Sequence, residues 1–316
     1  MLASIFSLNV IQTALELGCI YALVALALFL SYSILNIADL STDGCFTLGC
    51  AVACQVALTG HPFLALLAAM AAGVCSGFIT AFLQTRLGVE SILAGIISNT
   101  GLYTINLAVM GFSSNVSITG VDTVFSLFKG LVGGQWSRLI LLALIAAVIV
   151  IVLIRFFGTS LGLSIRATGD SLDMVSASSI NPKATITIGL CLANALTALS
   201  GCLIGEYNKF CDINLGTGMV TIALASLIIG EVFAGHRGGV GKRIVCVVLG
   251  SIVYRFIIAL ALRLNISAEY FKLVSAVIVA VAIAAPNMKG YVRLAKIKSN
   301  ARKLRALSGK GDETDA

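Results

Sequence analysis

A few polar side chains lie inside long apolar stretches of this sequence, where their chemistry could serve a function. Asn99 and Asn106 share one stretch and are seven residues apart, which places both on one face of a helix. Glu16 and Asn194 lie in two other apolar stretches. Polar groups are costly in hydrocarbon, so they usually face a bundle interior or a pathway. We predict that these four residues line a polar pathway, with interhelical hydrogen bonding as an equal alternative for Asn99 and Asn106.

Two further places hold residues with an expected structural or gating role. The break between the first two apolar stretches contains Asp39, Asp43 and Gly44, and we assign all three to this class. From the sequence, this break is either cytoplasmic or within the bilayer. Glu231 is assigned to the same class because it could pair with Arg255 on the next apolar stretch. Alternatively, each of these two side chains faces water.

The composition identifies the kind of protein that positions these groups. The chain has 316 residues, of which 59% are hydrophobic and 11% are charged, with a mean hydropathy of +1.03. A soluble domain carries roughly a quarter charged residues because its surface faces water, so a soluble enzyme is excluded. We predict an all-α, polytopic transmembrane helix bundle with about nine spans, each of roughly 20 apolar residues. The predicted spans are residues 9–35, 42–58, 62–84, 91–112, 138–157, 184–205, 216–234, 243–262 and 271–285.

Basic residues set the predicted orientation. Eight Lys and Arg residues follow the last predicted span before the first acid, Asp312. The positive-inside rule places this tail in the cytoplasm, and an odd number of spans then places the N-terminus outside. We divide the chain into a transmembrane domain, residues 1–290, and a basic cytoplasmic tail, residues 291–316. The tail is expected to contact anionic membrane lipid and not nucleic acid.

The sequence lacks the motifs of common enzymes and metal proteins. Cys50 and Cys54 are separated by three residues with no His nearby, so we predict no metal site. Residues 238–243 look like part of a phosphate-binding loop, but His236 replaces its first glycine and Arg243 its hydroxyl residue. We therefore expect no cofactor and no enzymatic activity in this chain. Energy for uphill movement of a solute would come from a partner or an ion gradient.

The longest polar interruption, residues 159–183, points to a partner. Gly169 is expected to break this segment, and Asp170 or Ser171 can then cap a short amphipathic helix that carries Met174. We predict that this helix lies outside the membrane on the cytoplasmic side and docks onto another protein. An ordinary loop helix is the alternative.

This segment also carries a resemblance to a known family. Its pattern G-x-x-x-R-A-x-G-D, at residues 162–170, is followed by a small-residue helix that ends in Ser179-Ile180-Asn181. The pattern resembles the membrane subunits of bacterial ATP-binding-cassette (ABC) importers for branched-chain amino acids and ribose. Residues 17–23, 35–49 and 216–230 are similar to further blocks of these permeases. Residues 35–44 look closest to a branch linked to aromatic amino-acid uptake with a lipoprotein receptor.

The resemblance implies a permease domain in residues 1–290 and a set of partners. In the family, the segment matching 159–183 is a coupling helix that fits a cleft in a cytoplasmic ATPase subunit, where ATP and Mg²⁺ are bound. A second permease copy and an extracytoplasmic substrate-binding protein complete the assembly in the bacterial inner membrane. The implied substrate is a small polar solute, with an aromatic amino acid such as tryptophan or tyrosine favoured. The implied ATPase-coupling residues are Arg166, Ala167, Thr168, Gly169, Asp170, Met174 and Asn181.

Three other classes of membrane protein remain as alternatives. An ion-coupled secondary transporter would place Glu16 or Glu231 in a proton or Na⁺ site. A passive channel would conduct without an ion gradient or ATP. A membrane anchor would need no polar residues in its spans, so Asn99 and Asn106 argue against it.

Overall fold

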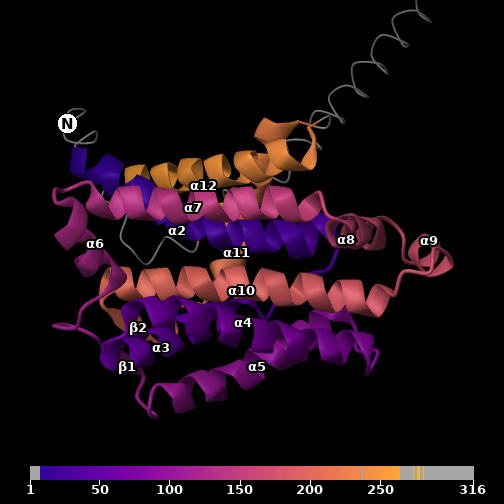
Figure 1. Ribbon diagram of the computed structural model, residues 1–316, viewed down its shortest axis with the longest axis horizontal. Helices are drawn as coiled ribbons and strands as arrows, with labels where there is room; N and C mark the ends of the chain where they lie inside the picture. The colour runs from indigo at the N-terminus through magenta and orange to yellow at the C-terminus, as the bar shows by residue number, and fades with distance from the viewer. Residues whose placement is uncertain (1–7, 236–237, 264–272, 274–275, 278–279, 281–316) are drawn as a thin grey trace, which may run out of the picture.

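The protein folds into a bundle of roughly aligned helices (Figure 1). The computed structural model describes residues 8–235 and 238–263, with residues 273, 276, 277 and 280. Within this part, six helices are long and apolar enough to cross a membrane, the first being α2 with its π-helical continuation η1. They are α2 (Leu8–Leu28) with η1 (Phe29–Ile34), α4 (Pro62–Thr85), α5 (Ser91–Val109), α7 (Ser137–Phe157), α10 (Pro182–Asn208) and α12 (Val240–Arg263).

Two shorter apolar helices, α3 (Thr42–Leu58) and α11 (Met219–Ala234), begin inside the bundle. The thiol of Cys45, in the first turn of α3, lies 3.3 Å from the carbonyl oxygen of Asn194, midway along α10. These helices confirm the all-α membrane bundle predicted from the sequence, and eight predicted spans coincide with described helices. The ninth, 271–285, falls almost entirely outside the described residues, as does the tail 291–316. The span number and the orientation stay predictions.

Two helices lie at the centre of the core. Every residue from 22 to 31 in α2 and η1 is buried, and so is every residue from 193 to 206 in α10. The most apolar windows of these two helices are 78% and 83% buried, against 22–33% for α4, α5, α7 and α12. The outer four helices thus keep broad apolar faces exposed, as lipid contact requires.

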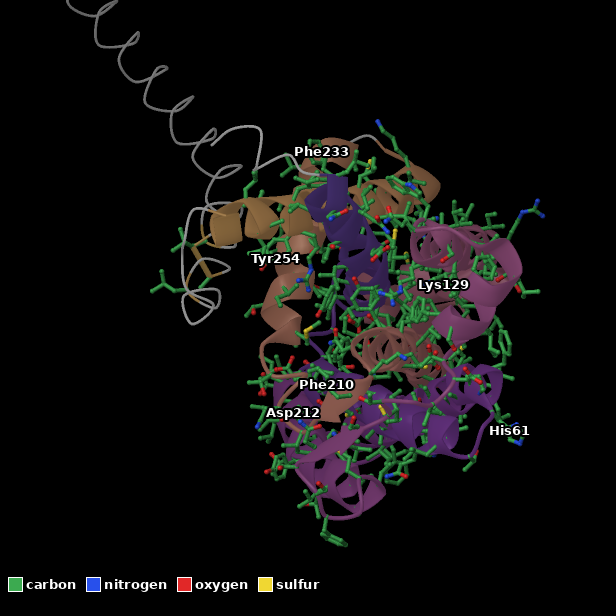
Figure 2. The ribbon with its side chains drawn as sticks, turned by 90° about the vertical axis from the view of Figure 1, so that its left-hand side faces the viewer. His61, Lys129, Phe210, Asp212, Phe233 and Tyr254 are labelled. Atoms are coloured by element: carbon green, nitrogen blue, oxygen red, sulfur yellow. The ribbon has the colours of Figure 1, made fainter. Side chains whose placement is uncertain are left out.

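Different small elements close the two ends of the bundle. Figure 1 shows α6 (Val124–Val132) and the strands β1 (Asn115–Ser117) and β2 (Phe210–Asp212) at one end, with α8 (Ser160–Asp170) and α9 (Leu172–Ala177) at the other. The strands pair antiparallel, with Val116 opposite Cys211. Figure 2 views the strand end, where His61, Lys129 and β2 lie. This small sheet is a minor departure from the predicted all-α fold.

Glycines let α3 and α4 approach α10 closely. A Cβ atom added to Gly77 would lie 2.6 Å from the carbonyl oxygen of Leu190, and one added to Gly201 would overlap the carbonyl oxygen of Phe46. Both glycines belong to G-x-x-x-G pairs, which are typical of tightly packed membrane helices. The backbones themselves are in contact, so these positions tolerate no side chain.

Replacing Gly201 with alanine is therefore expected to destabilise the bundle by about 1–3 kcal/mol, the usual effect of overpacking a core. Thermal unfolding of the full chain in detergent measures the change. Gly101→Ala is the matched control, because Gly101 is also helical but a Cβ there meets nothing within 4 Å. Equal unfolding temperatures for the two variants would contradict this account of the α3–α10 contact.

Candidate functional site

The N-terminal ends of α3 and α11 meet at Asp43. The carboxylate of Asp43 accepts the backbone N–H of Gly218 at Oδ2 and that of Val220 at Oδ1, both at 2.9 Å. Thr47, one turn further along α3, accepts the N–H of Gly216 at 3.1 Å. Since the first N–H groups of a helix have no partner within it, Asp43 caps α11 from a different helix. This position fits the structural role expected for Asp43.

A polar pocket with a volume of about 180 Å³ lies beside this junction. Its walls come from the start of α3, from one face of α5 and from the loop before α11. Asn99 and Asn106 both line it, and Tyr103 lies between them on the same face of α5. The lining residues are Asp43, Gly44, Thr47, Asn99, Thr100, Tyr103, Asn106, Ile213, Asn214 and Thr217.

Asn106 fixes α5 against α3. Its Nδ2 donates to the carbonyl oxygen of Gly44 at 3.0 Å, and its side chain is buried. Gly44 has no room for a side chain, because a Cβ would lie 2.6 Å from Asn99 Oδ1 and 2.9 Å from Leu102 Cβ. Asn99 and Asn106 were predicted to have one role and Gly44 another, and the structure places Gly44 in direct contact with this face of α5.

Asn194 and Asp39 form a second polar cluster, outside the residues that line the pocket. Asn194 Nδ2 donates to Asp39 Oδ2 at 2.8 Å, and the hydroxyl of Ser41 donates to Asp39 Oδ1 at 2.6 Å. All three side chains are buried. These bonds tie the break after η1 to the middle of α10, so the geometry of Asn194 is that of interhelical hydrogen bonding.

Glu16 lies in a third polar group. Its carboxylate accepts hydrogen bonds from Gln12 Nε2 and from the hydroxyl of Tyr207, both at 2.9 Å. Tyr207 is near the end of α10 that precedes β2, and the guanidinium of Arg138 lies 5.7 Å from the centre of its ring. The structure does not bring Glu16 to the pocket that contains Asn99 and Asn106.

Glu231 pairs with Arg243, so the pairing with Arg255 considered from the sequence is wrong. The carboxylate and guanidinium lie 2.6 Å apart, and Ser33 at the end of η1 bonds to both. Because α11 and α12 are joined by a short connection, Glu231 near the end of α11 lies beside the start of α12. Arg255 is twelve residues further along the chain, or about 18 Å of helix. It stacks instead on Tyr21, 3.4 Å from the ring centre.

The predicted coupling segment forms two helices, but Gly169 does not break it. Helix α8 continues through Gly169 to Asp170, and Ser171 caps α9 by accepting the N–H of Met174 at 3.4 Å. Gly169 is required by a contact: a Cβ there would overlap the carbonyl oxygen of Ile34, the last residue of η1. The expectation of a helix break was wrong because glycine here serves close packing and not a turn.

The other predicted coupling residues divide into anchored and exposed groups. Thr168 is buried and its hydroxyl lies 2.8 Å from that of Thr185 in α10, while Asn181 caps α10 by accepting the N–H of Lys183 at 3.0 Å. Arg166 and Ala167 are half-buried, and the remaining two residues, Asp170 and Met174, are exposed. The segment thus has one side fixed to the bundle and another that faces outwards.

The sequence did not predict several polar residues of the bundle, among them Tyr103, Ser33 and Glu206. Tyr103 could have been found, because it lies at helical spacing between Asn99 and Asn106. Ser33 and Glu206 could not: Glu206 is buried in α10 and accepts the N–H of Val124, 82 positions earlier in the chain. Among the described residues, no group of His, Cys, Asp and Glu is arranged to hold a metal ion.

Comparison with known proteins places these features in a family. Residues 10–283 match the family model described as "Branched-chain amino acid transport system / permease component". A tyrosine transport system permease protein of Clostridioides difficile (strain R20291) is 31% identical over 270 residues, which cover 85% of this chain and 88% of that protein. An uncharacterised protein of Rickettsia prowazekii (strain Madrid E) is 31% identical over 279 residues, covering 87% and 97% respectively. No solved structure matches the chain. The match spans most of the helix bundle, so the chain belongs to the family of branched-chain amino acid transport system permease components.

Proposed function

We propose that this protein is the membrane-spanning subunit of an ABC importer for an amino acid, with an aromatic amino acid such as tyrosine or tryptophan favoured. The family supports the transport role, and the name of the Clostridioides difficile relative supports the substrate class. Two copies of the chain would work with two cytoplasmic ATPase subunits and an extracytoplasmic binding protein in the inner membrane of a bacterium. ATP and Mg²⁺ would bind to the ATPase and not to this chain.

The contacts of α8 carry this proposal. Thr168 joins α8 to α10, and Gly169 rests on the carbonyl group of Ile34 at the end of η1. The chain then runs from η1 through the break that contains Asp39 to Asp43 and the pocket. π-Helical turns are frequent at functional sites, where they allow a local change of helix geometry. A movement of α8 would therefore be passed to the start of α3.

Helix α9 provides the surface for the ATPase subunit. Leu172 and Met174 are 53% and 56% exposed, and both lie at the end of the bundle opposite the strands (Figure 1). Exposed apolar side chains on a short polar segment suit insertion into a cleft of another protein. The proposed pathway passes Asn99 and Asn106, which line the pocket beside Asp43.

The experiment is affinity purification of the full chain from its native membrane in mild detergent, followed by counting of the chains that co-purify. We expect an ATPase subunit in equal stoichiometry, and we expect Met174→Glu to remove most of it, because a charge would be desolvated in the cleft. Leu131→Glu on α6 is the matched control, since Leu131 is 81% exposed at the opposite end. Purification without an ATPase, or equal loss in both variants, would contradict the coupling role of α9.

An ion-coupled transporter is the second candidate, and the buried carboxylate of Glu16 is the observation that favours it. In an ABC importer, Glu16 only joins α2 to α10 through Tyr207, while Gln12 bonds to it within α2. We therefore expect Glu16→Gln to retain uptake within about twofold, because an amide can keep one of these hydrogen bonds. Uptake in cells with and without an uncoupler, at constant ATP, is the measurement. Loss of uptake in Glu16→Gln together with collapse under the uncoupler would favour ion coupling.

A further inference from the structure

The pocket beside Asp43 contains a buried acceptor without a partner. Asn106 is 1% exposed, and its Oδ1 has no hydrogen-bond partner within the described part of the chain. Its Nδ2 donates to the carbonyl oxygen of Gly44, which accepts only, so the orientation of the amide is fixed. The unpartnered atom is therefore an acceptor, and it belongs to a residue that lines the pocket. A buried acceptor is costly unless a donor reaches it, so the site requires a donor group.

The acceptor chemistry of Asn106 selects the kind of group that can bind. Among the described residues that line the pocket, Asp43 carries a carboxylate. The Asp43 oxygens accept two backbone N–H groups at the start of α11. An ammonium group carries three N–H donors for Asn106 Oδ1, whereas an ionised carboxylate carries none.

Tyr103 adds a second attraction for such a group. It lines the pocket and is 52% exposed. The face of an aromatic ring attracts a cation and stacks on another aromatic ring. A volume of about 180 Å³ holds several water molecules and is sufficient for an ammonium group with the atoms attached to it.

We infer that this pocket binds the protonated amino group of the transported solute, with Asn106 Oδ1 as the acceptor. The identity of the solute rests on the proposed function, but the preference for an amine rests on the pocket alone. An amino acid would enter with its ammonium group towards Asn106 and Asp43. The pocket would accordingly discriminate against solutes that carry the same side chain and carboxylate without the amine.

Three probes that share one aromatic ring test this preference on the full chain in lipid nanodiscs. L-Tyrosine carries an amine and a carboxylate, tyramine carries only the amine, and 3-(4-hydroxyphenyl)propionate carries only the carboxylate. Calorimetric titration is expected to show binding of the first two and binding of the third that is about tenfold or more weaker, the usual contribution of a hydrogen bond in which one group is charged.

Two variants on α5 locate the site. Asn106→Leu is expected to weaken tyramine binding about tenfold or more, with folding checked by circular dichroism. Ser98→Ala is the matched control and should bind tyramine as the parent does. The hydroxyl of Ser98 is also buried without a partner in the described part of the chain, but Ser98 does not line the pocket.

The outcomes separate this inference from the proposed function. Equal binding of tyramine and the propionate, no binding of any probe, or unchanged tyramine affinity in Asn106→Leu would each overturn the amine site. If any of these results were found together with ATP-driven uptake of tyrosine, the importer function would be supported and the amine site alone would be rejected. Conversely, selective tyramine binding in a protein whose uptake needs an ion gradient would support the site and contradict the importer.

Discussion

Replacing Gly169 with leucine is expected to abolish solute uptake while the protein is still inserted into the membrane. A Cβ at this position would overlap the carbonyl oxygen of Ile34 and lie 3.0 Å from the Cα of Leu35. Both contacts are with backbone, which cannot rotate away as a side chain can. Helix α8 or the end of η1 must therefore move, and the proposed route from α8 to the pocket is changed at its first step. A steric clash of this kind raises the free energy by about 1–3 kcal/mol. It therefore changes the equilibrium constant of a coupled conformational change by roughly 5- to 150-fold.

Uptake of labelled L-tyrosine by cells, divided by the amount of the protein in the membrane, is the measurement for Gly169→Leu. Gly101→Leu is the matched control, because it introduces the same side chain into an exposed helical position with nothing within 4 Å of a Cβ. Loss of the protein from the membrane in proportion to the loss of uptake would make α8 a structural element only. Normal uptake would show that the contact with Ile34 does not transmit movement.

The sequence was sufficient to predict the long apolar helices and the shared face of Asn99 and Asn106 on α5. Apolar length alone located the eight helices that coincide with predicted spans, but not α6, α8 or α9, because a bilayer demands a minimum run of apolar residues only in helices that cross it. Asn99 and Asn106 were placed on one face by helical spacing, and the structure puts both in one pocket wall. Local patterns of this kind depend on neighbouring residues only, so a single sequence contains them.

The sequence could not predict which residues of different helices contact each other. Glu231 was matched to Arg255, yet it bonds to Arg243 and Ser33, because which turn of α12 meets α11 depends on how the two helices are joined. Gly169 was interpreted as a helix breaker for a related reason. Its local preference suggests a turn, whereas its contact is with Ile34, more than a hundred positions earlier. Long-range contacts of this kind override local propensity and leave no local pattern.

Replacing Asp43 with alanine is the second change for which a large effect is expected. The carboxylate accepts the N–H groups of Gly218 and Val220, so alanine leaves two donors of α11 without this partner and removes the negative charge at its N-terminus. Hydrogen bonds to a charged group are worth about 1.5–3 kcal/mol each, and a non-additive total of about 3 kcal/mol is expected. Asp43→Asn keeps one acceptor oxygen, so its loss of stability should be intermediate.

The unfolding temperature of the purified full chain ranks these variants by stability. A loss of about 3 kcal/mol in the free energy of unfolding lowers this temperature by roughly 5–10 °C for a chain of this size. Asp122→Ala is the matched control, because Asp122 is exposed and makes a side-chain bond to Ser126 at 3.2 Å. Its unfolding temperature should stay close to that of the parent. If Asp43→Ala were as stable as Asp122→Ala, the start of α11 would not depend on Asp43. The pocket would then have to be positioned by α5 alone, through Asn106 and the carbonyl group of Gly44.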